Sequence, residues 1–127
     1  MKTRRILLAD DDRLMTHVLR LKFEDAGFCV EVVTDGEAGL ACALAAVPDA
    51  VITDLQMPTM DGYRFARALR DNPATATIPI ILLTGRGHIL SQEEIELASI
   101  DRVVPKPFSA REILALVESL LDREAAA

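Results

Sequence analysis

The sequence predicts a single α/β domain in which a doubly wound parallel sheet carries helices on both faces. Short β-rich runs alternate with longer helical patterns along the chain, and this alternation is typical of βαβ units. The run from Ala50 to Thr53 has no polar alternation, as expected for a parallel strand buried on both faces. A chain of 127 residues, half of them hydrophobic, is long enough to form one core and too short for two.

Each expected element has a local signal in the sequence. Apolar runs predict strands over residues 6–9, 29–33, 50–53, 80–83 and 103–104. Helical spacing predicts helices over residues 13–26 and 63–70, together with three helices that begin near residues 35, 91 and 109. The residues expected to cap these helices are Asp12, Asp35, Ser91 and Ser109 at the starts and Gly27 at one end. Ser91 with Glu94, and Ser109 with Glu112, have the spacing of a capping box. The last helix is expected to reach about Asp122, and residues 123–127 to fray.

Composition excludes several classes of protein. No apolar stretch approaches the roughly 20 residues that cross a membrane, and no signal peptide opens the chain, so we expect a soluble, cytoplasmic protein with no membrane contact. The net charge of −6 argues against direct binding of nucleic acid. Cys29 and Cys42 lack the spacing of a metal or redox motif and are expected to be buried thiols.

The residues that follow the strands form an unusual set. Parallel strands end at one edge of the sheet, where ligands bind. There the sequence places Asp10 and Asp11 after the first strand, Asp54 after the third, Thr84 after the fourth and Lys106 after the fifth. Such carboxylates suit Mg²⁺, which is held by one or two carboxylates, waters and a phosphate oxygen. We therefore expect a site where Asp54 accepts a phosphoryl group, while the metal and Lys106 neutralise its charge.

Four segments of the sequence resemble the receiver domain of two-component response regulators, in particular the single-domain chemotaxis regulators. They are residues 6–12 (ILLADDD), 51–62 (VITDLQMPTMDG), 79–85 (PIILLTG) and 106–108 (KPF). The resemblance covers residues 4–122. It implies a flavodoxin-like (βα)5 fold with strand order 2-1-3-4-5.

The resemblance also implies a role for each site residue. Asp54 would be phosphorylated by a sensor histidine kinase or a phosphotransfer protein. Asp11 would bind Mg²⁺ directly, Asp10 at least partly through water, and Gln56 through its backbone carbonyl. Thr84 would donate a hydrogen bond to the phosphoryl group and Lys106 would pair with it, next to a cis Lys106-Pro107 bond. Phosphorylation would then alter a face that binds a downstream protein, an output domain or a second copy of the chain.

The sequence departs from the family pattern in three places. The family has an aromatic residue three positions before the lysine, where this chain has Val103, so we expect the output face to respond through loop and helix movement instead. The run Gly85-Arg86-Gly87-His88 predicts a mobile loop, in which Arg86 would gate the water that removes the phosphate. Pro105 restricts the pairing of the last strand.

Two other functions are weighed against this one. A small Mg²⁺-dependent phosphatase with an aspartate nucleophile would use Asp10 and Asp12 as its paired acids, but the position of Asp54 argues against it. A degenerate receiver would act as a constitutive binding module, which the complete set of acids, threonine and lysine disfavours. A domain that catalyses only its own phosphorylation and dephosphorylation is expected, rather than an enzyme with an external substrate.

Overall fold

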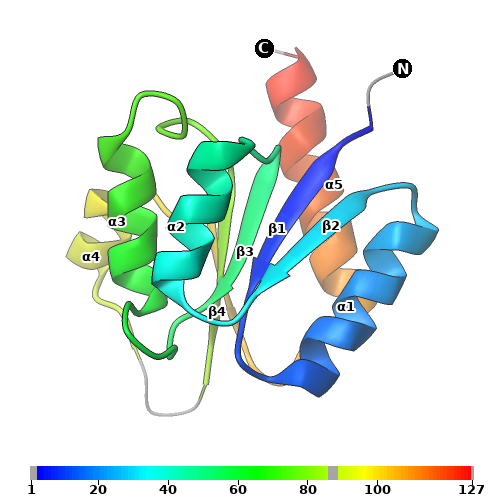
Figure 1. Ribbon diagram of the computed structural model, residues 1–127, viewed down its shortest axis with the longest axis horizontal. Helices are drawn as coiled ribbons and strands as arrows, with labels where there is room; N and C mark the ends of the chain where they lie inside the picture. The colour runs from blue at the N-terminus through cyan, green and yellow to red at the C-terminus, as the bar shows by residue number, and fades with distance from the viewer. Residues whose placement is uncertain (1–2, 86–88, 127) are drawn as a thin grey trace.

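The predicted α/β architecture is present in a computed structural model, which describes residues 3–85 and 89–126. Five parallel strands form one sheet in the order β2-β1-β3-β4-β5. Figure 1 shows helices on both sides of this sheet. The strands are β1 (Arg5–Ala9), β2 (Cys29–Val33), β3 (Ala50–Asp54), β4 (Ile80–Thr84) and β5 (Arg102–Pro105); the helices are α1 (Arg13–Asp25), α2 (Gly36–Ala45), α3 (Gly62–Asp71), α4 (Gln92–Leu97) and α5 (Ala110–Ala126).

Successive side chains of the buried strands point to opposite faces of the sheet, and they build two cores, one on each face. On β1, Ile6 and Leu8 pack in the core beneath α1 and α5, whereas Leu7 and Ala9 pack in the core beneath α2 and α3. All five residues of β3 and all five of β4 are buried. The two central strands are thus fixed on both faces, and their carboxyl ends cannot shift without disturbing both cores.

The predicted helix caps are confirmed by hydrogen bonds. The Asp12 carboxylate accepts from the Met15 amide at 3.1 Å, and the Asp35 carboxylate accepts from the Ala38 amide at 2.8 Å. Ser91 and Glu94 form the complete capping box. Ser109 accepts from the Glu112 amide at 3.1 Å, but the Glu112 side chain contacts the Ser109 hydroxyl instead of the backbone. Gly27 has φ +97, as its place after α1 requires.

Two expectations about the periphery are wrong. Cys29 is exposed because it begins β2, an edge strand in which no residue is buried. Cys42, on α2, is only half-buried. Helix α5 continues to Ala126, beyond the expected end at Asp122, since Glu and Ala are good helix formers. No helix of the described residues is long and apolar enough to cross a membrane. The loop expected at Gly85-Arg86-Gly87-His88 lies largely outside the described residues, as does Arg86.

Candidate functional site

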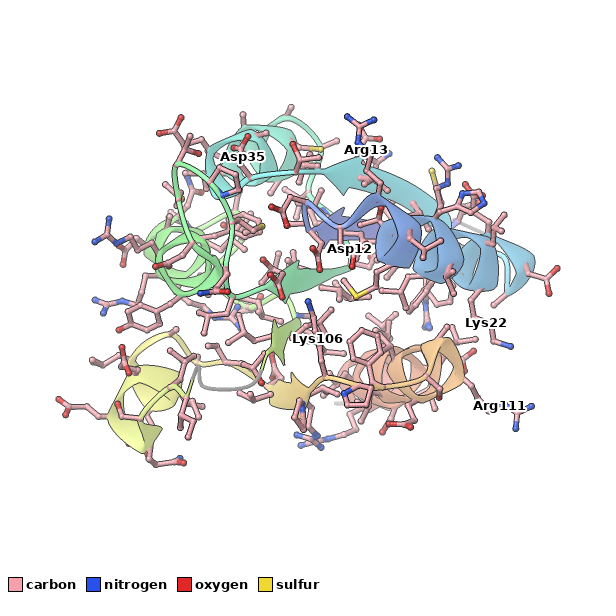
Figure 2. The ribbon with its side chains drawn as sticks, turned by 90° about the horizontal axis from the view of Figure 1, so that it is seen from below. Asp12, Arg13, Lys22, Asp35, Lys106 and Arg111 are labelled. Atoms are coloured by element: carbon pink, nitrogen blue, oxygen red, sulfur yellow. The ribbon has the colours of Figure 1, made fainter. Side chains whose placement is uncertain are left out.

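Side chains from four strand ends converge at one edge of the sheet. Asp10 follows β1, Asp54 ends β3 and Thr84 ends β4. All three residues are buried, with 1%, 6% and 6% of their surface exposed. Asp11 and Gln56 are exposed at the same edge. Seen from this edge, Lys106 lies between the strand ends, with Asp12 on the side of α1 (Figure 2).

Three carboxylates face one lysine across this edge. Asp10, Asp11 and Asp54 each place an oxygen within 4.8 Å of the others. The Lys106 Nζ lies 2.9 Å from Asp54 Oδ1 and 3.8 Å from Asp10 Oδ2. The sequence therefore correctly predicted that these residues meet, and the ion pair between Lys106 and Asp54 joins the third and fifth strands.

The backbone around Asp54 is held by contacts from β4 and from the loop that follows. The Leu55 amide donates to the carbonyl of Leu83 at 2.9 Å, which places Thr84 beside the acidic cluster. The Gly62 amide donates to the Leu55 carbonyl at 2.8 Å. A Cβ on Gly62 would collide with the Asp54 carbonyl, so this close approach requires glycine.

Lys106 is fixed by its own segment. Its amide donates to the Thr84 carbonyl at 2.8 Å, which continues the pairing of β4 with β5 past Pro105. The Lys106-Pro107 bond is cis, as the resemblance implies. Pro105 is tolerated because β5 is an edge strand.

Sequence reasoning missed two features of the segment that carries Asp54. The buried Thr53 hydroxyl donates to the Asp54 carbonyl at 2.9 Å and so steadies the end of β3. Thr59, in the loop after β3, has φ +62, which is unfavourable for a β-branched residue. Neither has a local signal, because threonine is ordinary in a strand and gives no indication of left-handed backbone.

The crowding of charges changes the pKa of two groups. Burial raises the pKa of Asp10 to about 6, aided by the charges of Asp54 and Asp11 and opposed by the Asp12 amide and by Lys106. Partial burial lowers the pKa of Lys106, but the hydrogen bond to Asp54 and the charges of Asp10 and Asp54 outweigh it, so the net shift is upward. At neutral pH the metal-free site thus holds a buried carboxylate that is costly to ionise.

We predict that Asp10→Asn stabilises the metal-free protein at pH 7.5 by about 2 to 3 kcal/mol, the equivalent of its pKa shift. Because the folded protein binds this proton more tightly than the unfolded chain does, the Asp10 contribution to stability falls as pH rises from about 4 to about 6. Urea unfolding with EDTA at pH 4 and pH 7.5 measures the difference between the two proteins. We expect the gain in the free energy of unfolding only at pH 7.5. An equal gain at pH 4 and pH 7.5 would contradict the prediction.

Comparisons with known proteins identify the family. Residues 6–118 match the family model of the response regulator receiver domain. The chain belongs to this receiver domain family. Over 119 residues it is 36% identical to the DNA-binding dual master transcriptional regulator RpaA of Synechocystis, covering 94% of this chain and 49% of RpaA. It is 37% identical to the response regulator MprA of Mycolicibacterium vanbaalenii, covering 94% of this chain and 51% of MprA. The receiver thus spans about half the length of these curated relatives.

Solved receiver structures share the fold. The chemotaxis response regulator CheY4 of Vibrio cholerae is 28% identical, with a TM-score of 0.85 and coverage of 93% of this chain and 98% of CheY4. The receiver domain of sensor histidine kinase PA1611 from Pseudomonas aeruginosa is 26% identical, with a TM-score of 0.84 and coverage of 95% and 99%. Its structure has a magnesium ion in the active site cleft. This receiver is therefore a domain of two-component signal transduction, and neither the phosphatase nor the degenerate module is favoured.

Proposed function

We propose that Asp54 accepts a phosphoryl group from a phosphohistidine of a sensor histidine kinase or of a phosphotransfer protein. The contact between Lys106 Nζ and Asp54 Oδ1 carries this proposal, because it places a fixed cation where phosphoryl charge would arrive. Asp54 is held at the end of a strand buried on both faces, so its carboxylate is already oriented. The proposed receiver domain comprises residues 4–122.

The acidic cluster fits a magnesium ion. The buried Asp10 Oδ2 has no hydrogen-bond partner among the described residues, and the three carboxylates offer the oxygen ligands that Mg²⁺ prefers. We assign the ion to Asp10, Asp11, Asp54 and the backbone carbonyl of Gln56. When bound, it would neutralise charge on the phosphoryl oxygens. The magnesium ion of the PA1611 receiver supports this assignment.

The transfer uses the residues around Asp54 in defined roles. A carboxylate oxygen of Asp54 attacks phosphorus, and the new O–P bond forms as the P–N bond of the phosphohistidine breaks. The electron pair leaves with the imidazole nitrogen, which takes up a proton. Lys106 neutralises a phosphoryl oxygen and the Thr84 hydroxyl donates a hydrogen bond to another. Attack by water on the acyl phosphate later restores Asp54 and releases phosphate, so the domain catalyses only reactions of its own acceptor.

Phosphorylation would change the surface built from α4, β5 and α5. It adds about −1.5 to −2 charges at the site. New contacts of the phosphoryl group with Thr84 and Lys106 would shift the ends of β4 and β5. The proposed reader of that surface is a downstream protein, an output domain or a second copy of the chain. A cytoplasmic location and the absence of direct nucleic-acid contact stay predictions.

Intact-mass spectrometry tests the proposal. The protein is incubated with acetyl phosphate in Mg²⁺ or in EDTA, and the expected result is a gain of one phosphoryl group only in Mg²⁺. The adduct should be removed by hydroxylamine, as acyl phosphates are, and should map to the peptide that contains Asp54. Absence of an adduct with acetyl phosphate and with a panel of kinases would contradict the proposal. Repeated turnover of a phosphomonoester would instead support the phosphatase.

A further inference from the structure

Arg70, in the last turn of α3, binds two segments of the chain outside its own helix. Its side chain is 12% exposed, so its guanidinium depends on protein acceptors. Nε donates to the Ala98 carbonyl at 3.1 Å, Nη1 to the carbonyls of Ala76 and Ile78 at 3.0 and 2.7 Å, and Nη2 to the Ser99 carbonyl and the Asp101 carboxylate at 2.7 and 3.4 Å. The planar fork of arginine suits such a set of fixed acceptors. One side chain thus ties the end of α3 to the loop before β4 and to the turn after α4.

The turn after α4, residues 98–101, is also tied to β4. The Ile80 amide donates to the Asp101 carboxylate at 2.8 Å, and the Asp101 amide donates to the Ile80 carbonyl at 3.0 Å. Ala98 is completely buried. Ile80 begins β4 and Thr84 ends it, so this turn lies one strand length, about 13 Å, from the phosphoryl end of the sheet.

Helix α4 itself is held much less firmly than the turn that follows it. None of its six residues is buried, Leu97 is 53% exposed and Ile89, just before the helix, is 91% exposed. The capping box of Ser91 and Glu94 is internal to this segment. Among the described residues, the hydrogen bonds of residues 89–97 stay within this segment or run to residues 98–100, and none reaches the sheet. Only the half-buried Leu90 and Ile95 pack on the core, which Val103 also contacts.

We propose that Arg70 is a positioning residue that fixes the C-terminal end of α4, so that α4 responds to phosphorylation by moving at its N-terminal end about a pivot at residues 98–101. The inference rests on the proposed function. Displacing the pivot would break the hydrogen bonds from Arg70 to this turn, together with those that join Asp101 to Ile80. Hydrogen bonds of a charged group are stronger than neutral ones. Displacing the other end changes only the packing of Leu90 and Ile95, and it lies at the phosphoryl edge because α4 follows the end of β4.

Amide hydrogen exchange can distinguish the two ends of α4. The Asp101 amide donates to the Ile80 carbonyl of β4 at 3.0 Å, and the amides of residues 98–100 donate to carbonyls of residues 94–96 at 3.1 Å. Loosening of the pivot from the sheet would therefore raise exchange at Asp101, and unwinding of the turn would raise it at residues 98–100. The protein is measured in Mg²⁺ with and without beryllium fluoride, a phosphoryl mimic. In the wild type we expect the mimic to change exchange in residues 90–96 and to leave residues 98–101 unchanged. Equal changes in both segments would overturn the pivot, and this result needs no variant.

Arg70→Gln tests the residue itself, with Arg67→Gln as its matched control. Arg67 lies on the same helix, and its guanidinium contacts Tyr63 of that helix. In Arg70→Gln we expect residues 98–101 to become sensitive to the mimic, with exchange rising about tenfold on loss of charged hydrogen bonds, whereas Arg67→Gln should retain the wild-type pattern. An Arg70 variant whose pivot stays insensitive would overturn the role of Arg70. If the proposed function fails instead, acetyl phosphate gives no adduct and the mimic changes nothing in any variant.

Discussion

Replacing Asp54 with alanine is expected to abolish the Mg²⁺-dependent mass gain from acetyl phosphate. The variant loses the nucleophilic oxygen and one proposed metal ligand, while Asp10 stays buried and Asp11 lies at the exposed rim. Asp54→Asn is the closer match in shape, and it should also stay unlabelled because an amide oxygen is a much weaker nucleophile. Intact-mass spectrometry over a time course measures both variants.

Asp61→Ala is the matched control for the Asp54 variants. Asp61 lies in the loop after β3 and caps α3, accepting from the Arg64 amide at 2.8 Å. Its loss should cost about 1 kcal/mol of stability and leave labelling intact. If Asp54→Ala still gained a phosphoryl group, the acceptor would be another carboxylate of the cluster, and the phosphatase-like use of Asp10 would return to consideration.

Much of the fold was predictable because the information is local. A buried strand such as β3 needs a short apolar run, and a helix start needs a residue such as Asp12 at its cap, so both appear in a few adjacent letters. Exposure is different. Cys29 reads as part of an apolar strand, and the implied strand order places this strand at the edge of the sheet. The sequence pattern does not show that an edge strand leaves Cys29 exposed, and here no residue of β2 is buried.

The candidate site also has features that the sequence predicts and features that depend on the packed structure. The meeting of Asp10, Asp54 and Lys106 was predictable because parallel strands end at one edge. The raised pKa of Asp10 was not, since it depends on a burial that only the packed structure defines. The contacts of Arg70 were also hidden, because two of its acceptors lie 28 and 29 residues away and no sequence pattern marks them.

Lys106→Met is expected to slow Mg²⁺-dependent phosphorylation by about 10²- to 10³-fold, the usual cost of removing one group that stabilises developing charge. The variant keeps the length and apolar stem of the side chain but removes the ammonium that lies 2.9 Å from Asp54 Oδ1. Lys22→Met is the control, because Lys22 lies on α1 away from the strand ends (Figure 2). The rate of mass gain from acetyl phosphate at saturating Mg²⁺ measures both.

Mg²⁺ affinity separates loss of this charge from damage to the site. Lys106 repels a divalent ion and occupies an oxygen of Asp54, so its removal should leave Mg²⁺ binding unchanged or make it tighter, even as phosphorylation slows. A disordered site would lose both properties together. Calorimetric titration with Mg²⁺ therefore decides between them: slow phosphorylation with retained metal binding assigns Lys106 to the phosphoryl group, and loss of metal binding would assign it to the architecture of the acidic cluster.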